Sequence, residues 1–310
     1  MRTLICGSMA YDTIMVFPDH FKNHILSEKI HILNVAFLVP EMRREFGGCA
    51  GNIAYNLKLL GGEPVIMATV GDDFGQYTER LRQQAIDTRH IRHIEGSYTA
   101  QAFITTDLDD NQITAFHPGA MGQAHENTVG DAKDIKLGIV APDGRQGMVD
   151  HARQFREAGI PFIFDPGQGL PMFNGEELLQ FVQQADYLAC NDYEAQLLQE
   201  RTGQTLEGLA KQVQALVVTL GAKGSRIYAR GEVHDIPPAK PAEIVDPTGC
   251  GDAYRAGLMF GMLKGMDWPT CGRLAGLLGA LKIARQGGQN HRFDYAEIAQ
   301  RFKAEYGYAL

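Results

Sequence analysis

The segment from Ile244 to Leu263 constrains the fold more than any other part of the chain. Its first two residues predict the end of a strand, two glycines predict a turn, and apolar residues at helical spacing follow from Asp252 onwards. Glycine lets the backbone approach a ligand, and the unpaired N–H groups of a first helical turn attract anions. The segment therefore predicts a strand, a turn and a helix that together bind an anion such as phosphate.

Asp252 follows this turn directly. An acidic residue in the first turn of a helix often does no more than offset the helix dipole. Beside an anion site it can also accept the proton of an attacking hydroxyl, while backbone N–H groups hold the phosphoryl group that is transferred. We therefore predict that Asp252 is a catalytic base and that the amides of Gly249, Cys250 and Gly251 form an anion hole.

Two motifs resemble those of the ribokinase-like (PfkB) family of sugar and nucleoside kinases. Residues 246–252 resemble the D-x-T/N-G-x-G-D signature near the C-terminus of that family, and residues 47–52 resemble its N-terminal G-G-x3-N element. The motifs occur in the family's order, and the resemblance covers nearly the whole chain. It implies an ATP- and Mg²⁺-dependent phosphotransferase that acts on an alcohol group.

The composition is typical of a globular enzyme with a small ligand. Of the 310 residues, 45% are hydrophobic and 21% are charged, which is enough for a large core. The formal net charge of -8 disfavours a nucleic-acid partner. Five cysteines lie far apart without a metal-binding spacing, and the chain begins with neither a secretion signal nor a membrane span. We therefore expect a cytoplasmic enzyme with no membrane partner.

Strands alternate with amphipathic helices along most of the chain, which predicts parallel βαβ units. We expect an α/β fold in which helices flank a doubly wound, mostly parallel sheet, as a single catalytic domain over residues 1–310. Two β-rich segments, about 13–46 and 98–120, predict a small β-sheet lid. Its expected strands are residues 13–17, 30–39, 99–106 and 112–116. The resemblance implies that this lid closes over the substrate and excludes water.

Asp12 follows the first predicted strand, at the sheet edge where ligands bind in α/β proteins. Turn formation is its simpler explanation, as helix capping is for Asn52. The resemblance implies that Asp12 holds two sugar hydroxyls, that Asn52 binds another, and that the neighbouring glycines let the sugar approach. The predicted substrate-binding residues are Ser8, Asp12, Gly47, Gly48, Cys49, Asn52, Phe103 and Phe116.

Asn191 and Glu194 form an N-x-x-E element at the end of a predicted strand. A capping asparagine with a solvated glutamate explains this bare spacing more often than a metal site does. The resemblance implies that both residues organise Mg²⁺ through water and bind the nucleotide phosphates. It also implies that Thr219, Gly221 and Gly224 lie beside ATP.

The resemblance further implies a possible monovalent cation, typically K⁺, bound by Asp246 and Thr248. One departure from the family concerns the lid hairpin, which carries Asn111 and Gln112 where several members have an arginine. Lys223 or the metal could neutralise the phosphate instead, and Arg255 is expected to face the surface.

Aromatic residues on the predicted lid strands favour a nucleoside over a free sugar, because a base needs a flat apolar surface. Residues 7–14, 46–62 and 102–121 resemble bacterial adenosine kinases. We therefore expect phosphorylation of the adenosine 5′-hydroxyl. The alternatives are a sugar kinase of the ribokinase or fructokinase type, another nucleoside kinase, and a non-catalytic nucleotide-binding sensor. The expected assembly is a monomer or a lid-mediated homodimer.

Overall fold

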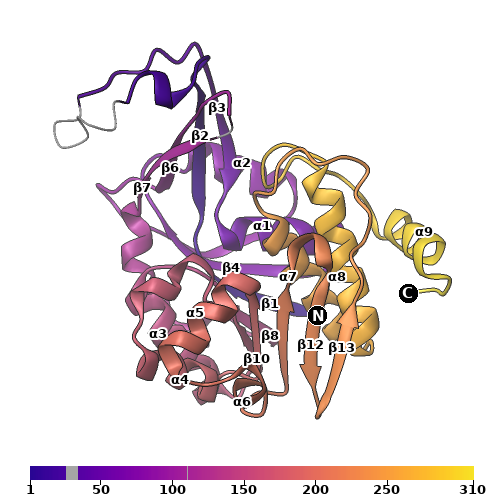
Figure 1. The fold of residues 1–310 in the computed structure, drawn as a ribbon. Helices are drawn as coiled ribbons and strands as arrows, with labels where there is room; N and C mark the ends of the chain where they lie inside the picture. Colours follow the sequence, from indigo (N-terminus) through magenta and orange to yellow (C-terminus); the bar gives the residue numbers. More distant parts are fainter. Residues whose placement is uncertain (26–33, 110) are drawn as a thin grey trace.

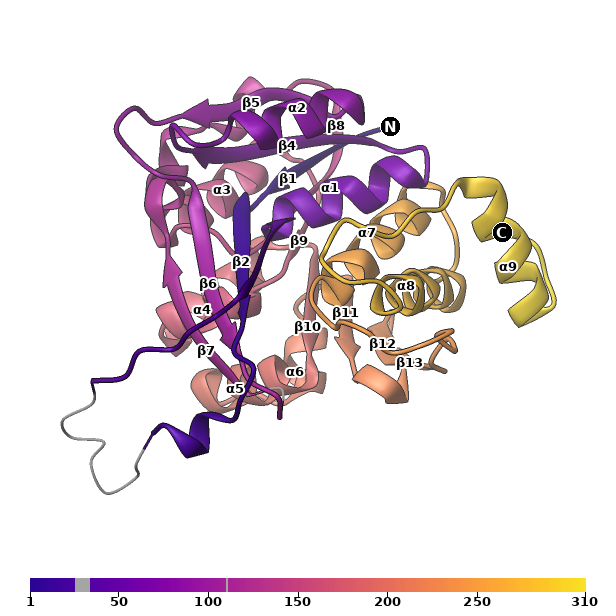
Figure 2. The ribbon, with the colours of Figure 1, turned by 90° about the horizontal axis from the view of Figure 1, so that it is seen from above.

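A large nine-stranded sheet lies at the centre of the protein, and a separate four-stranded sheet adjoins it (Figure 1 and Figure 2). This is a computed structural model, which describes residues 1–25, 34–109 and 111–310. A short connection joins the two sheets: the first strand of the large sheet ends at Cys6, and the first strand of the small sheet begins at Ala10.

The large sheet is mostly parallel. Its strands are β1 (Arg2–Cys6), β4 (Glu63–Val70), β5 (Asp87–His93), β8 (Ile135–Val140), β9 (Phe162–Phe164), β10 (Tyr187–Asn191), β11 (Ala215–Thr219), β12 (Ser225–Ala229) and β13 (Glu232–Ile236). They lie in the order β13-β12-β11-β10-β9-β8-β1-β4-β5. All neighbours from β11 to β5 pair in parallel, and β12 and β13 extend the sheet antiparallel. The predicted α/β sheet is confirmed.

Helices cover both faces of this sheet (Figure 1). One face packs against α1 (Cys49–Leu59), α2 (Gly75–Gln83), α7 (Cys250–Leu263), α8 (Trp268–Ile283) and α9 (Tyr295–Tyr306). The other packs against α3 (Arg145–Ala158), α4 (Gly175–Gln184), α5 (Asp192–Thr202) and α6 (Leu206–Ala210). Successive side chains of a strand alternate between faces, so Ile5 joins the first core and Leu4 the second. Among the helices so described, none is long and apolar enough to cross a bilayer.

The small sheet has the strand order β3-β2-β6-β7. Its strands are β2 (Ala10–Val16), β3 (Glu41–Gly47), β6 (Ala100–Thr106) and β7 (Gln112–His117). Three of them match predicted strands closely. The fourth does not: residues 34–39 form no strand, residues 30–33 lie outside the described part, and β3 occupies 41–47 instead. The sequence did not indicate β3 as a strand because most of its residues are charged. In the structure, β3 nevertheless pairs with β2 along its full length.

The predicted strand end before α7 is also wrong. Ile244 and Val245 lie in a loop, with 77% and 48% of their surface exposed. Val245 instead donates its N–H to the carbonyl of Ile283 at 2.9 Å, which attaches the loop to the end of α8. Two adjacent apolar residues were therefore a poor indicator of a strand here.

Candidate active site

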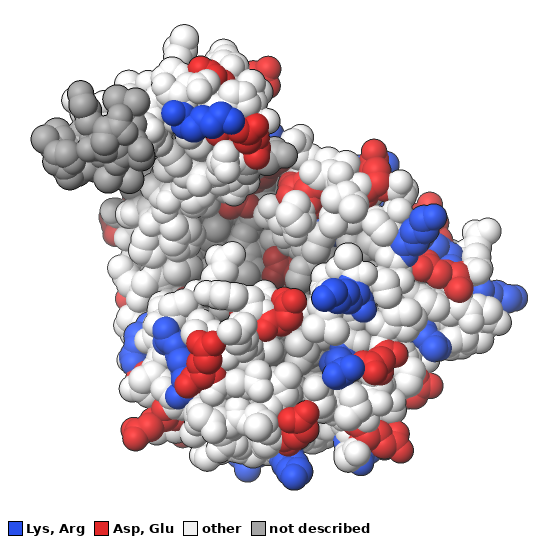
Figure 3. All heavy atoms as spheres, viewed as in Figure 1, with Lys and Arg blue, Asp and Glu red and all other residues white. Residues whose placement is uncertain are grey.

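The predicted site residues gather where the parallel strands end and the small sheet begins. Ser8, Asn191 and Thr219 lie at or just beyond the carboxyl ends of β1, β10 and β11, and Asp252 lies in the first turn of α7. Open α/β sheets bind their ligands at this edge. Figure 3 shows that the molecule is hollowed between the small sheet and the large one, with acidic side chains inside the hollow.

The turn before α7 leaves backbone donors unpaired. Gly249 caps the helix with a φ of 78°, a left-handed conformation that glycine adopts without strain. Within the described residues, the N–H groups of Gly249, Gly251 and Asp252 have no hydrogen-bond acceptor. The N–H of Cys250 differs, because it donates to the carbonyl of Pro247 at 3.1 Å. We define the anion cradle as the three unpaired N–H groups, so the Cys250 amide, which the sequence assigned to it, is already engaged.

Asp252 has the environment of a base that works near neutral pH. Its Oδ2 accepts a hydrogen bond from Nδ2 of Asn52 at 2.8 Å. Burial raises the pKa of Asp252 to about 7, opposed by this hydrogen bond and by Arg255, and reinforced by the Asp165 carboxylate. A base is most effective when its pKa lies near the working pH, so this environment suits proton abstraction.

Asn52 is held at both ends of its side-chain amide. Its Oδ1 accepts from Nε2 of Gln289 at 3.2 Å, while its Nδ2 donates to Asp252. A Cβ atom on Gly288 would lie 2.5 Å from this Oδ1, so only glycine fits there. Gly48, not Asn52, is the N-cap of α1. Asn52 therefore orients the predicted base, and Gln289 is a site residue that no sequence motif indicated.

Asp12 lies on β2, next to the end of β3. A Cβ atom on Gly47 would come within 2.5 Å of Oδ2 of Asp12, so the glycine provides the space for this carboxylate. Burial, together with the nearby carboxylates of Asp246 and Glu45, raises the pKa of Asp12 to about 6. The effect of Asp246 indicates that these two carboxylates lie near each other.

Ser8, Gly48 and Cys49 join the end of β1 to the start of α1. The hydroxyl of Ser8 accepts the N–H of Cys49 at 3.2 Å. Gly48 has a φ of 84°, and a Cβ there would lie 2.5 Å from the carbonyl oxygen of Ser8. These residues therefore fix the close contact between strand and helix on which the position of Asn52 depends.

The two phenylalanines predicted to contact substrate lie on opposite faces of the small sheet. Ala102 pairs with both Asp12 and Phe116, whereas Phe103 pairs with Ala115. Paired residues share a face and successive residues alternate. Phe116 therefore lies on the face of Asp12, and Phe103 lies on the other, so the two rings cannot form one platform within this sheet.

Asn191 and Glu194 form a reciprocal helix cap at the start of α5. Oδ1 of Asn191 accepts the N–H of Glu194, and Oε2 of Glu194 accepts the N–H of Asn191, both at 2.7 Å. The remaining polar atoms, Nδ2 and Oε1, make no hydrogen bond within the described residues. Burial, with the charge of Asp165, raises the pKa of Glu194. The cap thus leaves one carboxylate oxygen free for water or metal.

The glycines after β11 have different roles. Gly221 has a φ of 56° and open space around the position of a Cβ, whereas a Cβ on Gly224 would lie 2.0 Å from the carbonyl oxygen of Ile236. The hydroxyl of Thr219 donates to the carbonyl of Cys190 at 3.4 Å. Gly221 therefore leaves room for a ligand, while Gly224 lets the chain enter β12.

Arg255 is buried, so the expectation that it faces the surface is wrong. Its Nε and Nη2 donate to the two carboxylate oxygens of Asp165 at 3.0 and 3.2 Å, with 3% of the arginine exposed. Asp165 follows β9, 90 residues earlier, and the spacing within α7 could not reveal this partner. The pair fixes the first turns of α7 to the strand ends.

Asp246 organises the turn from outside the cradle. Its two carboxylate oxygens accept the N–H groups of Thr248 and Gly287, each at 2.8 Å. Burial alone would raise the pKa of Asp246, but these hydrogen bonds hold it below its ordinary value. The side chain thus ties the turn to the C-terminal loop.

In the described part of the lid hairpin, Asn111 is engaged with a neighbouring carboxylate. Nδ2 of Asn111 donates to both carboxylate oxygens of Asp107, at 3.2 and 3.1 Å. Asn111 therefore closes its own hairpin and does not take the role of the missing arginine.

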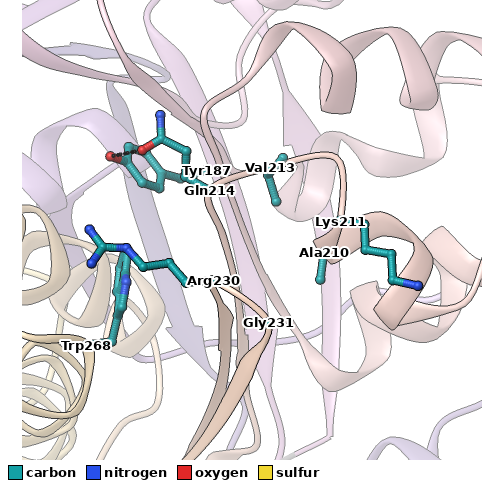
Figure 4. A pocket seen from close by; sticks show the side chains of 8 residues that line it. All are labelled: Tyr187, Ala210, Lys211, Val213, Gln214, Arg230, Gly231 and Trp268. Atoms are coloured by element: carbon teal, nitrogen blue, oxygen red, sulfur yellow. Dashed lines mark hydrogen bonds between the residues drawn. The ribbon is translucent and has the colours of Figure 1, made fainter.

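A pocket at the opposite end of the large sheet contains none of these residues. Tyr187 and Trp268 line it with ring centroids 5.9 Å apart, Arg230 lies next to Trp268, and Lys211 lines the pocket farther from the two rings (Figure 4). Tyr187 begins β10, whereas Asn191 ends it, so the length of a strand separates this pocket from the site.

The sequence as a whole is similar to known kinases. A family model described as pfkB family carbohydrate kinase matches residues 9–293. A nucleoside kinase of Methanothermobacter thermautotrophicus is 33% identical over 89% of this chain and 90% of its own length. One from Methanocaldococcus jannaschii is 30% identical, over 89% and 91%.

Solved structures show the same similarity. The structure of Burkholderia thailandensis nucleoside kinase in complex with inosine is 53% identical, with a TM-score of 0.91 over 99% of both chains. Its complex described as ADP-inosine is 54% identical, with a TM-score of 0.88 over 99% of this chain and 97% of that one. By its motifs, its ribokinase-like fold and these matches, the chain belongs to the pfkB family of carbohydrate kinases.

Proposed function

We propose that this chain is an ATP-dependent nucleoside kinase that phosphorylates the 5′-hydroxyl of purine nucleosides, adenosine and inosine above all. One observation carries the proposal: Asp252, with a pKa of about 7, lies next to unpaired backbone N–H groups and is oriented by Asn52. Such a carboxylate can take a proton from an alcohol at the moment when the amides stabilise a phosphoryl group.

The proposed reaction is a direct transfer. The nucleoside 5′-oxygen attacks the γ-phosphorus of ATP, the bond from that phosphorus to the β-γ bridging oxygen breaks, and the hydroxyl proton passes to Asp252. ADP leaves with the bridging oxygen. The N–H groups of the anion cradle bind the phosphoryl oxygens as charge develops on them, and one such donor is worth about 3 to 4 kcal/mol.

Asp12 suits the ribose hydroxyls because an ionised carboxylate accepts from two O–H donors at once. Bound in this way, the ribose would present its 5′-hydroxyl to Asp252. Gly47 leaves room for the Asp12 carboxylate, and Gly48 lets the start of α1 pack closely against Ser8. Closure of the small sheet over the bound sugar would exclude water from the transfer.

Mg²⁺ would be held by the free carboxylate oxygen of Glu194 and by Asn191, mainly through water, as this ion prefers. It would neutralise the phosphate charge. Thr219 and Gly221 would lie beside the nucleotide phosphates, where the open space at Gly221 supports a close approach.

The small sheet favours a nucleoside over a free sugar. The face that carries Asp12 also carries the apolar side chains of Ile14, Ala102, Ile104 and Phe116, on which a base can lie, with Arg43, Glu45 and Thr114 beside them. The relatives named nucleoside kinases, one of them bound to inosine, support the same choice. We therefore favour purine nucleosides over ribose and fructose, and keep a sugar kinase as the alternative.

The direct test is ADP release from MgATP with adenosine, inosine, guanosine, ribose and fructose as acceptors. Turnover of the purine nucleosides with little on either sugar is expected. Turnover of ribose or fructose alone would reject the nucleoside while retaining the kinase, and ADP release from none of them would reject the proposed function. Sedimentation of the same sample tests the predicted monomer or homodimer.

A further inference from the structure

A buried lysine lies behind the anion cradle. Lys282, in the last turn of α8, has no exposed surface. Its Nζ donates to the main-chain oxygen of Asp246 at 2.7 Å and to that of Arg285 at 3.0 Å. Lysine is almost never fully buried unless it is paired, so a fully enclosed ammonium between two carbonyls indicates a specific role.

This ammonium joins the two segments that support the cradle. Asp246 begins the turn that leads to Gly249, and Arg285 begins the C-terminal loop that includes Gly287. The same Asp246 binds Gly287 through its carboxylate. Asp246 therefore contacts the C-terminal loop through its side chain and the Lys282 ammonium through its main-chain oxygen. Removal of Lys282 would take away the second of these contacts and make the turn before α7 less rigid.

The sequence resemblance implied a monovalent cation at Asp246 and Thr248, and the residues present do not fit one. The main-chain oxygen of Asp246 is already bound to an ammonium, and its two carboxylate oxygens already accept N–H groups. A second cation next to the first would be repelled. Lys282 thus occupies one of the Asp246 oxygens that such an ion could use.

We propose that the ammonium of Lys282 takes the place of a monovalent cation behind the anion cradle, so that this kinase needs no K⁺. Lys282 is a positioning residue: it touches neither substrate nor phosphate, and it stabilises the turn whose amides do. This inference rests on the proposed kinase function for its activity readout, while a second readout, thermal stability, is independent of it.

The first experiment measures kcat for ADP release with a purine nucleoside, in a buffer whose only cations are Mg²⁺ and tetramethylammonium, with and without added K⁺. The wild type is expected to have the same kcat in both. A strong rise of the wild-type kcat with K⁺ would overturn the proposal.

The second experiment uses Lys282→Ala, with Lys303→Ala, an exposed lysine on α9, as the matched control. Without K⁺, Lys282→Ala is expected to lose kcat by about 10²-fold, with a smaller change in nucleoside KM. K⁺ or NH₄⁺ should restore part of the loss, since the deletion vacates the carbonyls. A folded Lys282→Ala with wild-type kcat, or a loss that neither ion relieves, would contradict the proposal.

Thermal unfolding separates this inference from the proposed function. K⁺ is expected to raise the Tm of Lys282→Ala but not that of the wild type or Lys303→Ala, because only the first has a vacated cation site. A K⁺-dependent Tm of the wild type would overturn the inference even if no nucleoside is turned over. If Lys282→Ala does not fold, Lys282→Gln keeps a donor without the charge, and wild-type kcat in that variant would overturn it equally.

Discussion

Asn52 donates a hydrogen bond to Asp252 across 200 positions of sequence, at 2.8 Å. The two residues end the two motifs and lie in α1 and α7, which begin within them, so this contact is where the N-terminal and C-terminal motifs meet. Gln289 donates a hydrogen bond to Oδ1 of Asn52, and the absence of a side chain at Gly288 leaves space for the Asn52 amide. The proposed base is therefore positioned by the whole chain and not by its own turn alone.

The first prediction concerns the base itself. Asp252→Asn keeps the shape of the side chain but cannot accept a proton, so kcat should fall by about 10²- to 10⁴-fold. Nucleoside KM and Tm should change little, since the amide still fits beside Asn52. Near-normal turnover in the folded variant would show that another group takes the proton.

The second prediction concerns the pH dependence of activity. Asp252 must be ionised to act, and its pKa is about 7, while Asp12 has a pKa of about 6. Activity should therefore fall as the pH drops through about 7, with a further loss near 6. The pH profile of kcat/KM measures this, and a limb near pH 4 would contradict the raised pKa values.

The stability of the fold should depend on pH in the opposite direction to the activity. Burial raises both pKa values above those of the unfolded chain, so both carboxyls bind protons more readily when folded. Their contribution to stability is present at low pH and is lost as the pH rises through about 6 to 7. Asp252→Asn should remove part of this dependence from the Tm, which is the control for the assignment.

The third prediction concerns the buried ion pair of Asp165 and Arg255. Arg255→Met leaves the Asp165 carboxylate buried without its partner, which costs about 3 to 5 kcal/mol. The double variant Asp165→Leu/Arg255→Met should be less destabilised than the two single changes added together. Urea unfolding measures each free energy.

A surface pair provides the control for that cycle. Arg153 bonds Glu157 on the exposed side of α3 at 2.8 Å, and Arg153→Met should change the free energy of unfolding far less. Equal effects of Arg153→Met and Arg255→Met would show that burial does not decide the outcome.

Local motifs predicted the fold class well, and the site residues that they indicate, Gly249 and Asp252 among them, stay predictions. A turn glycine and an acidic residue of a first helical turn depend on local sequence, so the positions of Gly249 and Asp252 at the start of α7 could be predicted directly. The apolar alternation of strands and helices likewise predicted the parallel sheet.

Contacts between distant segments could not be predicted. In the sequence, Arg255 and Lys282 have the character of surface residues. In the structure, Arg255 binds Asp165, which follows β9, and Lys282 binds the main-chain oxygen of Asp246 in the turn before α7. The strand at 41–47 was missed because its charged residues lack an apolar pattern. In each case the partner lies far away in sequence and only the folded chain provides it.

The fourth prediction uses the two faces of the small sheet. Phe116 shares the face of Asp12, whereas Phe103 does not, and the two rings are similarly exposed at 52% and 41%. Stacking of a base on an aromatic ring is worth about 1 to 3 kcal/mol. Phe116→Ala should therefore raise the KM for adenosine by about fivefold or more, while Phe103→Ala, the matched control, leaves it nearly unchanged. The reverse order would place the base on the other face.

The last prediction concerns the space beside Asp12. Gly47→Ala would place a Cβ 2.5 Å from Oδ2 of Asp12, closer than real contacts allow, so the carboxylate must turn away from the ribose. Nucleoside KM should rise strongly, while the Asp252 site and its kcat are affected less. Gly75→Ala is the control, because a Cβ there meets nothing within 4 Å. Isothermal titration with adenosine measures the binding directly. Wild-type affinity in Gly47→Ala would mean that Asp12 does not hold the sugar, and the proposed polyol contact would have to be assigned to another residue.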